Sequence, residues 1–225
     1  MKVTFVRHSC YTVELKNHFL IFDYIGGPLN IPKGKKIIWV VTHGHKDHYN
    51  KDIFTFHGEI QYVISNDIVD DLSKYQVTWV EPDGVYSLDD VLIKTYGSTD
   101  EGISIYLQVE GKGIYHSGDL NYWIWPRYSQ KDIEQMEIDF TKEVNKVKDE
   151  IIDIAMIIVD PRLKDDYSLA GSYYLKTLNA KYFFPLHMWG EFSLSKRFKK
   201  EFQGLYPDKK IMEIKKEGQT FSLPL

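Results

Sequence analysis

The 225-residue sequence contains a single cysteine, Cys10, so no disulfide can form within the chain. It also lacks any apolar stretch that approaches the ~20 residues required of a membrane-spanning helix. Met1 leads directly into an alternating strand pattern, and no signal-peptide pattern precedes it. These absences lead us to expect a cytoplasmic protein with no membrane association.

The sequence also has no excess of basic residues and no low-complexity tract. The net charge is −4, and no basic patch stands out, which argues against a nucleic-acid backbone as the main partner. No linker or compositional break divides the chain, so we predict one domain that spans residues 1–225. A chain of this length can bury a large core in one domain. The oligomeric state is left open.

The apolar pattern predicts a strand-rich first half and a more helical second half. Expected strands in the first half cover residues 3–7, 11–15, 19–22, 37–41, 61–64, 77–80, 91–95, 103–109 and 113–116, with a short helix at 67–75. Residues 129–132 form a capping box, and apolar residues at helical spacing follow as far as Ile151. That pattern predicts an amphipathic helix of about twenty residues. Further elements are expected at 154–159 (strand), 169–178 (helix), 182–184 (strand), 194–206 (helix), 211–215 (strand) and 220–223 (strand).

Residues 43–48 read His-Gly-His-Lys-Asp-His and follow a buried-strand pattern at 37–42. Three imidazoles and a carboxylate in so short a segment are typical of a metal site, because histidine is the commonest metal ligand and carboxylates complete such sites. His43 and His45 lie two apart, so they can approach one ion from the same side of an extended segment. Asp47 and His48 come at a turn or helix start and should point elsewhere. This arrangement suits two ions that share one loop.

The motif His43-x-His45-x-Asp47-His48 resembles the signature of the metallo-β-lactamase superfamily, whose hydrolases carry one or two metals, usually zinc, in a four-layer αββα sandwich. The block at 114–119 resembles the strand end whose aspartate bridges the two metals, and the block at 183–187 resembles the late strand whose histidine completes the second site. The stretches at 8–11 and 20–23 resemble the first hairpin of the ascorbate-phosphate-lactonase-like branch. The resemblance implies this α/β sandwich fold and the metal ligands His43, His45, Asp47, His48, Asp119 and His187.

One part of the family pattern is missing from the sequence. The family usually supplies another histidine to the first metal shortly before the Gly118-Asp119 block, but residues 96–102 contain none. Either Asp100, Thr99 or water fills the place, or the first site is weak. An oxygen donor there would favour harder ions, so we expect one or two zinc ions with manganese or magnesium as alternatives at the weaker site.

Other residues could support the ligands or face the substrate. Asp23 could accept the N–H of a ligand histidine or simply occupy a turn, and His116 could lie behind the ligands, face the substrate or be a core histidine. The aromatic stretch at 121–128 could wall the substrate pocket, with Arg127 as an anion anchor, or form a lid packed onto the core. Candidates for such roles are Asp23, Asp100, His116, Trp123, Trp125, Arg127 and Trp189. By contrast, we interpret His8, His18, His57 and Cys10 as structural or surface residues.

The resemblance implies a metal-dependent hydrolase in which a metal-activated hydroxide attacks a small ester, lactone or phosphoester. Asp47 would bind the second ion and orient the nucleophile, or act as a general base if only one metal is bound. Two alternatives stay open: a phosphodiesterase acting on a cyclic or short nucleotide, and a metal-binding scaffold or sensor with little turnover. The expected partner is a small-molecule substrate.

Overall fold

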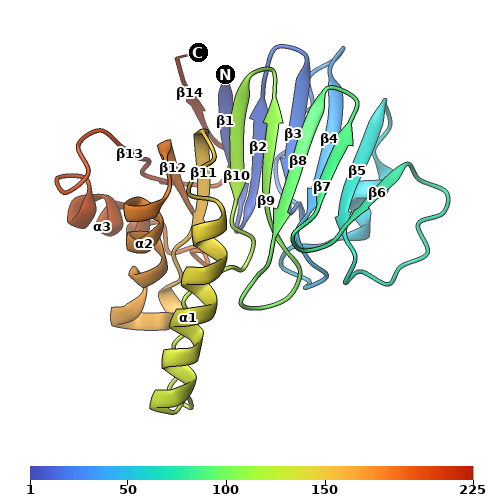
Figure 1. The fold of residues 1–225 in the computed structure, drawn as a ribbon. Coiled ribbons are helices and arrows are strands. Elements are labelled where there is room, and N and C mark those ends of the chain that lie inside the picture. Colours follow the sequence, from blue (N-terminus) through green and yellow to red (C-terminus); the bar gives the residue numbers. More distant parts are fainter. Residues whose placement is uncertain (225) are drawn as a thin grey trace.

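The computed structural model describes residues 1–224 as two seven-stranded β-sheets with three α-helices (Figure 1). The first sheet has the order β14-β1-β2-β3-β4-β5-β6, and the second has the order β13-β12-β11-β10-β9-β8-β7. Strands of the first sheet are β1 (Lys2–Arg7), β2 (Cys10–Glu14), β3 (His18–Phe22), β4 (Lys36–Val41), β5 (Ile60–Ser65), β6 (Val77–Val80) and β14 (Gln219–Ser222). Strands of the second sheet are β7 (Val85–Leu88), β8 (Val91–Tyr96), β9 (Ser104–Val109), β10 (Lys112–His116), β11 (Ile152–Ile158), β12 (Ala180–Leu186) and β13 (Lys210–Ile211). The helices are α1 (Gln130–Lys146), α2 (Leu169–Thr177) and α3 (Ser193–Phe202), with short 3₁₀ helices η1 (Lys51–Thr55) and η2 (Pro161–Asp166).

The two sheets bury a shared apolar core, which includes Tyr11 and Phe22 from the first sheet and Tyr115 from the second. The three α-helices lie beside the second sheet (Figure 1), where α2 packs against β11 and β12. A second apolar cluster around Trp39 covers the outer face of the first sheet and includes Ile53 of η1. Among the described residues, η1 and loops form this outer layer. The predicted sandwich of two sheets with helices outside is confirmed.

Strand direction determines where the functional residues meet. Strands β3 to β6 run parallel to one another, and so do β10 to β13. Parallel strands end at the same edge of their sheet, so the residues that follow them gather there. The segments concerned follow β3 (Asp23), β4 (42–48), β10 (117–119), β11 (159–160) and β12 (187–189).

Most predicted elements are confirmed with ends that shift by no more than two residues, although α3 ends at Phe202, four residues before the predicted end. The capping box is present, because the Ser129 hydroxyl accepts the Asp132 N–H and the Asp132 carboxylate accepts the Ser129 N–H. Helix α1 ends at Lys146, short of the predicted Ile151, and β13 is shorter than the strand predicted at 211–215. Strand β7, with the sequence Val-Tyr-Ser-Leu, was not predicted; its residues alternate between exposed and half-buried positions.

The helix predicted at 67–75 is wrong, since these residues form turns and irregular structure. Its aspartates are engaged elsewhere: Asp67 accepts the Gly44 N–H, Asp70 accepts the Tyr49 hydroxyl, and Asp71 accepts the Ser73 N–H. Side-chain hydrogen bonds of this kind compete with helix formation. The apolar residues Ile68 and Leu72 are buried against the first sheet instead.

None of the helices within residues 1–224 combines the length and the apolar character that crossing a membrane would require.

Candidate metal centre

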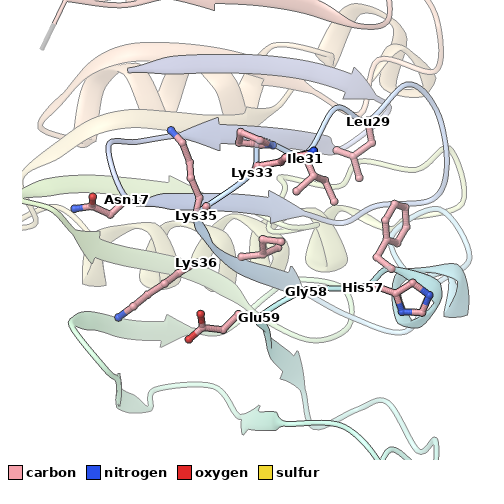
Figure 2. Close-up of a pocket in the computed structure, with 13 residues that line it drawn as sticks. Asn17, Leu29, Ile31, Lys33, Lys35, Lys36, His57, Gly58 and Glu59 are labelled. Carbon is pink, nitrogen blue, oxygen red and sulfur yellow. The ribbon is translucent and has the colours of Figure 1, made fainter.

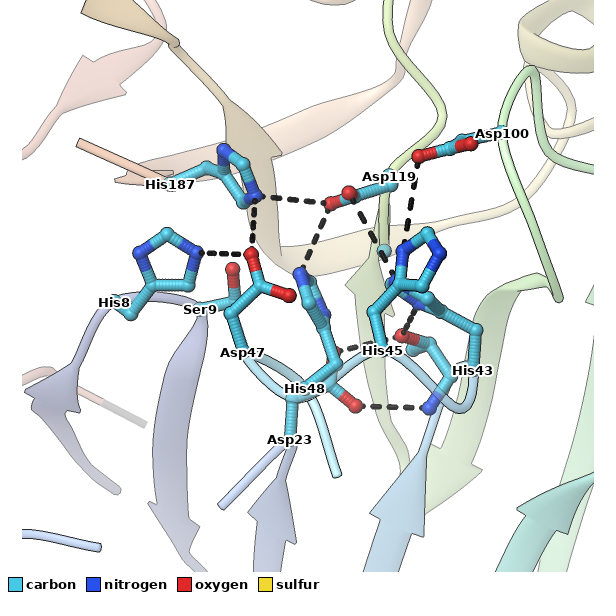
Figure 3. A network of polar contacts seen from close by, with 12 residues as sticks. His8, Ser9, Asp23, His43, His45, Asp47, His48, Asp100, Asp119 and His187 are labelled. Atoms are coloured by element: carbon cyan, nitrogen blue, oxygen red, sulfur yellow. Dashed lines mark hydrogen bonds and ion pairs between the residues drawn. The ribbon is translucent and has the colours of Figure 1, made fainter. Parts of the chain in front are cut away.

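The structure brings the six predicted ligands together where the two sheets share an edge (Figure 3). Asp119 lies at the middle of the cluster. Its carboxylate oxygens lie 3.1 Å from His48 Nε2, 3.4 Å from His187 Nε2 and 3.8 Å from His43 Nε2. One carboxylate therefore faces histidines from both sheets, as a group that bridges two ions would.

The donor atoms fall into overlapping groups in which all members lie within 4.8 Å of one another. One group contains His8, Asp47, His48 and His187. The others contain His43, His48 and Asp119, and His45, Asp100 and Asp119. Asp119 and His48 each belong to two of these groups, so the three groups form one continuous cluster.

The histidine ring atoms that face the centre have no hydrogen-bond partner within the described part of the chain. Nε2 of His8, His43, His48 and His187 and Oδ1 of Asp119 are all buried and unpaired. A buried polar atom left unpaired costs about 1–3 kcal/mol, so five in one place would be a large penalty for a fold without a ligand there. Coordination to cations would satisfy all five, and the residues present therefore fit a metal centre.

Hydrogen bonds on the opposite ring nitrogens fix the direction of these histidines. His48 Nδ1 lies 2.7 Å from Asp23 Oδ2, and His187 Nδ1 lies 2.8 Å from Asp160 Oδ2. A carboxylate in this position receives the Nδ1–H and turns the Nε2 lone pair toward the metal. Asp23 thus lies where a ligand-orienting carboxylate was considered in the sequence, and Asp160 repeats the arrangement in the other sheet.

A relay through Thr42 orients His43 in a similar way. The Thr42 hydroxyl donates to Asp23 Oδ2 at 2.7 Å, so it can accept the His43 Nδ1–H across 3.1 Å. The backbone N–H of Thr42 also donates to Asp23, at 2.8 Å. One buried carboxylate therefore positions both His43 and His48.

The electrostatics of the cluster favour bound cations. The neighbouring rings of His187 and His8, whose Nε2 atoms lie 3.6 and 3.4 Å from its carboxylate, hold the pKa of Asp47 far below its usual range. Burial raises the pKa of Asp119, but the nearby His48 and His187 outweigh that effect and hold it well below normal. Burial and the neighbouring His48 lower the pKa of His43 to about 4. Asp47 and Asp119 are therefore ionised at neutral pH and His43 is neutral, which are the forms that bind metal ions. Burial lowers the pKa of His48, but Asp119 and Asp23 outweigh that effect and raise it to about 10, so a bound cation would have to displace the proton of His48.

Asp100 lies beside the donors that were expected at the first metal position. Asp100 Oδ2 lies 3.9 Å from His45 Nδ1, and both residues group with Asp119. The Thr99 hydroxyl is engaged with Asn121, whose carbonyl and N–H it contacts at 2.6 and 3.0 Å. Of the replacements considered in the sequence, Asp100 is the side chain that the structure places beside the other donors.

Two residues of this site were not identified from the sequence. The interpretation of His8 as structural or surface is wrong, because its buried Nε2 lies 3.4 Å from Asp47 within one of the donor groups. Its only signal was its place at the end of the first strand. Asp160 follows the apolar strand β11 directly, and this strand-end aspartate was a signal that could have been used. His18, which pairs with Glu110, and the exposed His57 lie outside the donor groups.

His116 is buried behind the ligands and does not line the cavity. Its Nε2 contacts the Ser9 carbonyl at 2.9 Å, and its Nδ1 accepts the Gly118 N–H at 3.0 Å. The ring therefore ties the turn that carries His8 to the turn that carries Asp119.

A cavity of about 320 Å³ opens beside the donor cluster. The aromatic stretch predicted at 121–128 contributes to it through Trp123, Trp125 and Tyr128, and Arg127 lines it as well. Trp189, a separate candidate, is also a lining residue. Arg162, which the sequence did not single out, is a further lining residue. His45, Asp47, Asp100 and Asp119 also line it, so a molecule held here would touch the donor cluster.

A larger cavity, of about 790 Å³, lies on the outer face of the first sheet (Figure 2). Its lysines are largely paired, since Lys35 contacts Glu14 at 2.9 Å and Lys36 contacts Asp90 at 3.1 Å. None of the donor groups lies there. Size alone therefore does not identify the functional cavity in this protein.

The fold and the donor cluster together define a metal-dependent hydrolase of the metallo-β-lactamase type. The family model described as "Beta-lactamase superfamily domain" matches residues 2–187. The chain therefore belongs to the metallo-β-lactamase superfamily.

Solved structures with the same fold are distant in sequence. Igni18, described as a metallo hydrolase from the hyperthermophilic archaeon Ignicoccus hospitalis, is similar at 17% identity over 99% of both chains, with a TM-score of 0.72. An isothiocyanate hydrolase from Delia radicum gut bacteria is similar at 15% identity over 99% of both chains, with a TM-score of 0.59. CmlA, a diiron β-hydroxylase from Streptomyces venezuelae, matches at 10% identity over 99% of this chain and 54% of its own, with a TM-score of 0.65. At these identities the likeness shows the fold alone.

Proposed function

We propose that the protein binds two divalent cations, with zinc as the physiological metal, and hydrolyses a small ester, lactone or phosphoester. The observation that carries the proposal is a set of four buried Nε2 atoms that make no hydrogen bond. They converge from three separate segments, at His8, at His43 and His48, and at His187. Igni18 and the isothiocyanate hydrolase share this fold and are described as hydrolases, which supports hydrolysis as the reaction type.

The donor groups suggest how the residues divide between two ions. His8, Asp47, His48 and His187 would hold the second ion, and His43, His45 and Asp100 would hold the first, with Asp119 between them. Imidazole and carboxylate donors suit zinc, while the oxygen donor of Asp100 makes manganese or magnesium an alternative at the first position. His8 adds a ligand to the set that the sequence predicted.

When bound, such cations supply Lewis acidity and lower the pKa of coordinated water to about 7. The protein's own part is to position and to move protons. The carboxylate of Asp47 lines the cavity, where it can orient an attacking water molecule while it holds the second ion; it would act as the general base only if a single ion is bound. Asp23 and Asp160 keep the ligand rings in place, and the tryptophans of the cavity restrict the access of bulk water.

The proposal is tested by metal analysis of the purified protein, with anomalous diffraction to locate each ion. We expect two ions per chain, the second of them within about 2.0–2.2 Å of His8 Nε2, as zinc–nitrogen bonds require. The variant His8→Gln should retain less metal, whereas His57→Gln, a histidine outside the cluster, should retain the wild-type amount. A protein that binds no divalent metal, or that leaves His8 uncoordinated, would contradict the assignment.

Turnover is tested in parallel on a panel of esters, lactones and phosphodiesters, including cyclic nucleotides, with and without a chelator. Chelator-sensitive hydrolysis of small esters or lactones supports the proposal. Preference for cyclic nucleotides would favour the phosphodiesterase alternative. Full metal occupancy with no turnover of any substrate would favour a sensor or scaffold.

A further inference from the structure

We propose that the substrate of this site carries a carboxylate or phosphate group that Arg162 binds at the wall of the metal-site cavity. This inference rests on the proposed function, and it names the chemical class of the substrate. The cavity of about 320 Å³ accommodates only a small molecule, so an anion held by Arg162 would place the rest of that molecule beside Asp47 and Asp119.

The guanidinium of Arg162 is held in place by one edge. Its Nε contacts Asp160 Oδ1 at 3.0 Å and Oδ2 at 2.9 Å, and its Nη2 contacts Oδ2 at 2.6 Å. An arginine offers five N–H groups. Within residues 1–224, Nη1 has no hydrogen-bond acceptor, so the end of the guanidinium formed by Nη1 and Nη2 stays available. Two parallel N–H groups of this kind match the two oxygens of a carboxylate or phosphate.

Three tryptophans surround this arginine. Its Cζ lies 4.8 Å from the ring centre of Trp189 and 5.4 Å from those of Trp123 and Trp125. The rings come from the loops after β10 and β12, whereas Arg162 follows β11. Aromatic faces attract the cation and hold its plane, while the side chain of Arg162 stays 40% exposed, so an anion can reach its free edge from solvent.

Backbone strain supports a functional role for this arrangement. His187 and Trp189 have φ values of +66° and +50°, in the left-handed region that residues with a side chain rarely adopt. Strained residues cost about 1–3 kcal/mol each and cluster at functional sites. Here the strained turn directs a donor histidine toward the cluster and a tryptophan toward Arg162 two residues later.

Charge balance at the cavity points the same way. Asp47, Asp100 and Asp119 line it, and in the proposed function two divalent cations neutralise these carboxylates. Arg127 and Arg162 then remain at the wall, with Asp160 opposing only one of them. A substrate with a negative group would complement this wall, whereas a neutral substrate would leave the free edge of Arg162 without a partner.

Asp160 also contacts His187. An alternative role of Arg162 is therefore to position His187 through Asp160, without binding an anion. The experiment must therefore separate anion binding from positioning. It compares wild type, Arg162→Gln and Arg162→Lys, with Arg197→Gln as a control, because Arg197 also pairs with a carboxylate but lies on α3 outside the cavity. Metal content is measured for each protein.

Binding of inorganic phosphate and of acetate to the metal-loaded proteins is measured by calorimetry. We expect Arg162→Gln to weaken binding of at least one anion tenfold or more at unchanged metal content, Arg162→Lys to weaken it less, and Arg197→Gln to leave it unchanged. Hydrolysis of 4-nitrophenyl acetate is compared with hydrolysis of the 4-nitrophenyl hemiester of glutarate. The kcat/KM ratio of the anionic to the neutral ester should fall by ten- to a hundredfold in Arg162→Gln.

Binding of both anions within twofold of wild type in Arg162→Gln would overturn the proposal. So would an equal loss on both esters together with a loss of metal, because that result would make Arg162 a positioning residue only. If the wild type hydrolyses neither ester, the proposed function is in question, but the calorimetric comparison still decides whether Arg162 binds anions.

Discussion

Asp160 offers a sharp test of how the metal site is organised, because one buried carboxylate contacts both a ligand and the cavity arginine. The substitution Asp160→Asn keeps the size of the side chain and removes its charge. The carbonyl oxygen of the new side chain can still accept a hydrogen bond. Its NH₂ group is a donor, however, and cannot pair with the N–H donors of Arg162 or of His187. His187 would then lose the partner that fixes its ring direction across 2.8 Å.

The size of the effect follows from the role of the contact. Loss of a group that orients a metal ligand costs about 10- to 100-fold in metal affinity. This range corresponds to about 1.4–2.7 kcal/mol. We expect the upper part of the range, since Asp160 is fully buried and no other described side chain contacts His187 Nδ1.

The assay is a competition for zinc between the protein and a chromophoric chelator at neutral pH. Asp153→Asn is a matched control, because Asp153 lies on the same strand β11 and also accepts two contacts, from Lys112 and the Gly113 N–H, away from the metal site. Thermal unfolding of the metal-free proteins separates a loss of affinity from a loss of stability. A zinc affinity of Asp160→Asn within twofold of wild type, with the fold intact, would refute the orienting role.

Three further outcomes can be measured on stability. Removal of bound metal by a chelator should lower the melting temperature, because a cation present at a hundred times its dissociation constant stabilises the folded state by about 2.7 kcal/mol. An unchanged melting temperature would argue against a structured metal site. Gly102→Ala should destabilise the fold by at least about 2 kcal/mol in urea unfolding, since Gly102 has a φ of +69° and an added Cβ would collide with the Thr42 carbonyl. Glu110→Gln should cost about 1–3 kcal/mol at pH 7, because the carboxylate accepts His18 Nδ1–H and three backbone N–H groups. Burial raises the pKa of Glu110, but these hydrogen bonds outweigh that effect and lower the pKa. The contribution of the carboxylate to the free energy of unfolding is therefore complete above the usual carboxyl pKa and is lost as the pH falls through the lowered value. A difference in unfolding free energy between wild type and variant that grows below pH 4 would contradict this reasoning.

The early ligands could be predicted from the sequence because they are neighbours in it. His43, His45, Asp47 and His48 follow one apolar strand, so a local pattern carries the chemistry. Asp119 and His187 could be added because each ends a strand in the order that the resemblance requires. These predictions needed the direction and sequence of the strands but no knowledge of their contacts.

His8 and Asp160 were not predicted, because each is a single polar residue whose importance depends on long-range contacts, although the place of Asp160 just after an apolar strand was a usable signal. His8 lies near His187 because the His187 N–H donates to the His8 carbonyl between residues far apart in the chain, at 3.2 Å. Asp160 gains its role only when β11 and β12 pair in parallel register. The same limit explains the wrong helix at 67–75, where Asp67 and Asp70 are satisfied by residues of the loop after β4.

In both sheets an aspartate that follows one strand contacts a histidine that follows the parallel neighbouring strand. In the first sheet Asp23 follows β3 and holds His48, which lies in the loop after the parallel neighbour β4. In the second sheet Asp160 follows β11 and holds His187, which follows the parallel neighbour β12. Each half of the donor cluster is therefore rigid within its own sheet, but the cluster is complete only when the sheets are stacked. Because a bound cation stabilises only the state in which both halves meet, metal binding must oppose separation of the two sheets and not merely order a loop.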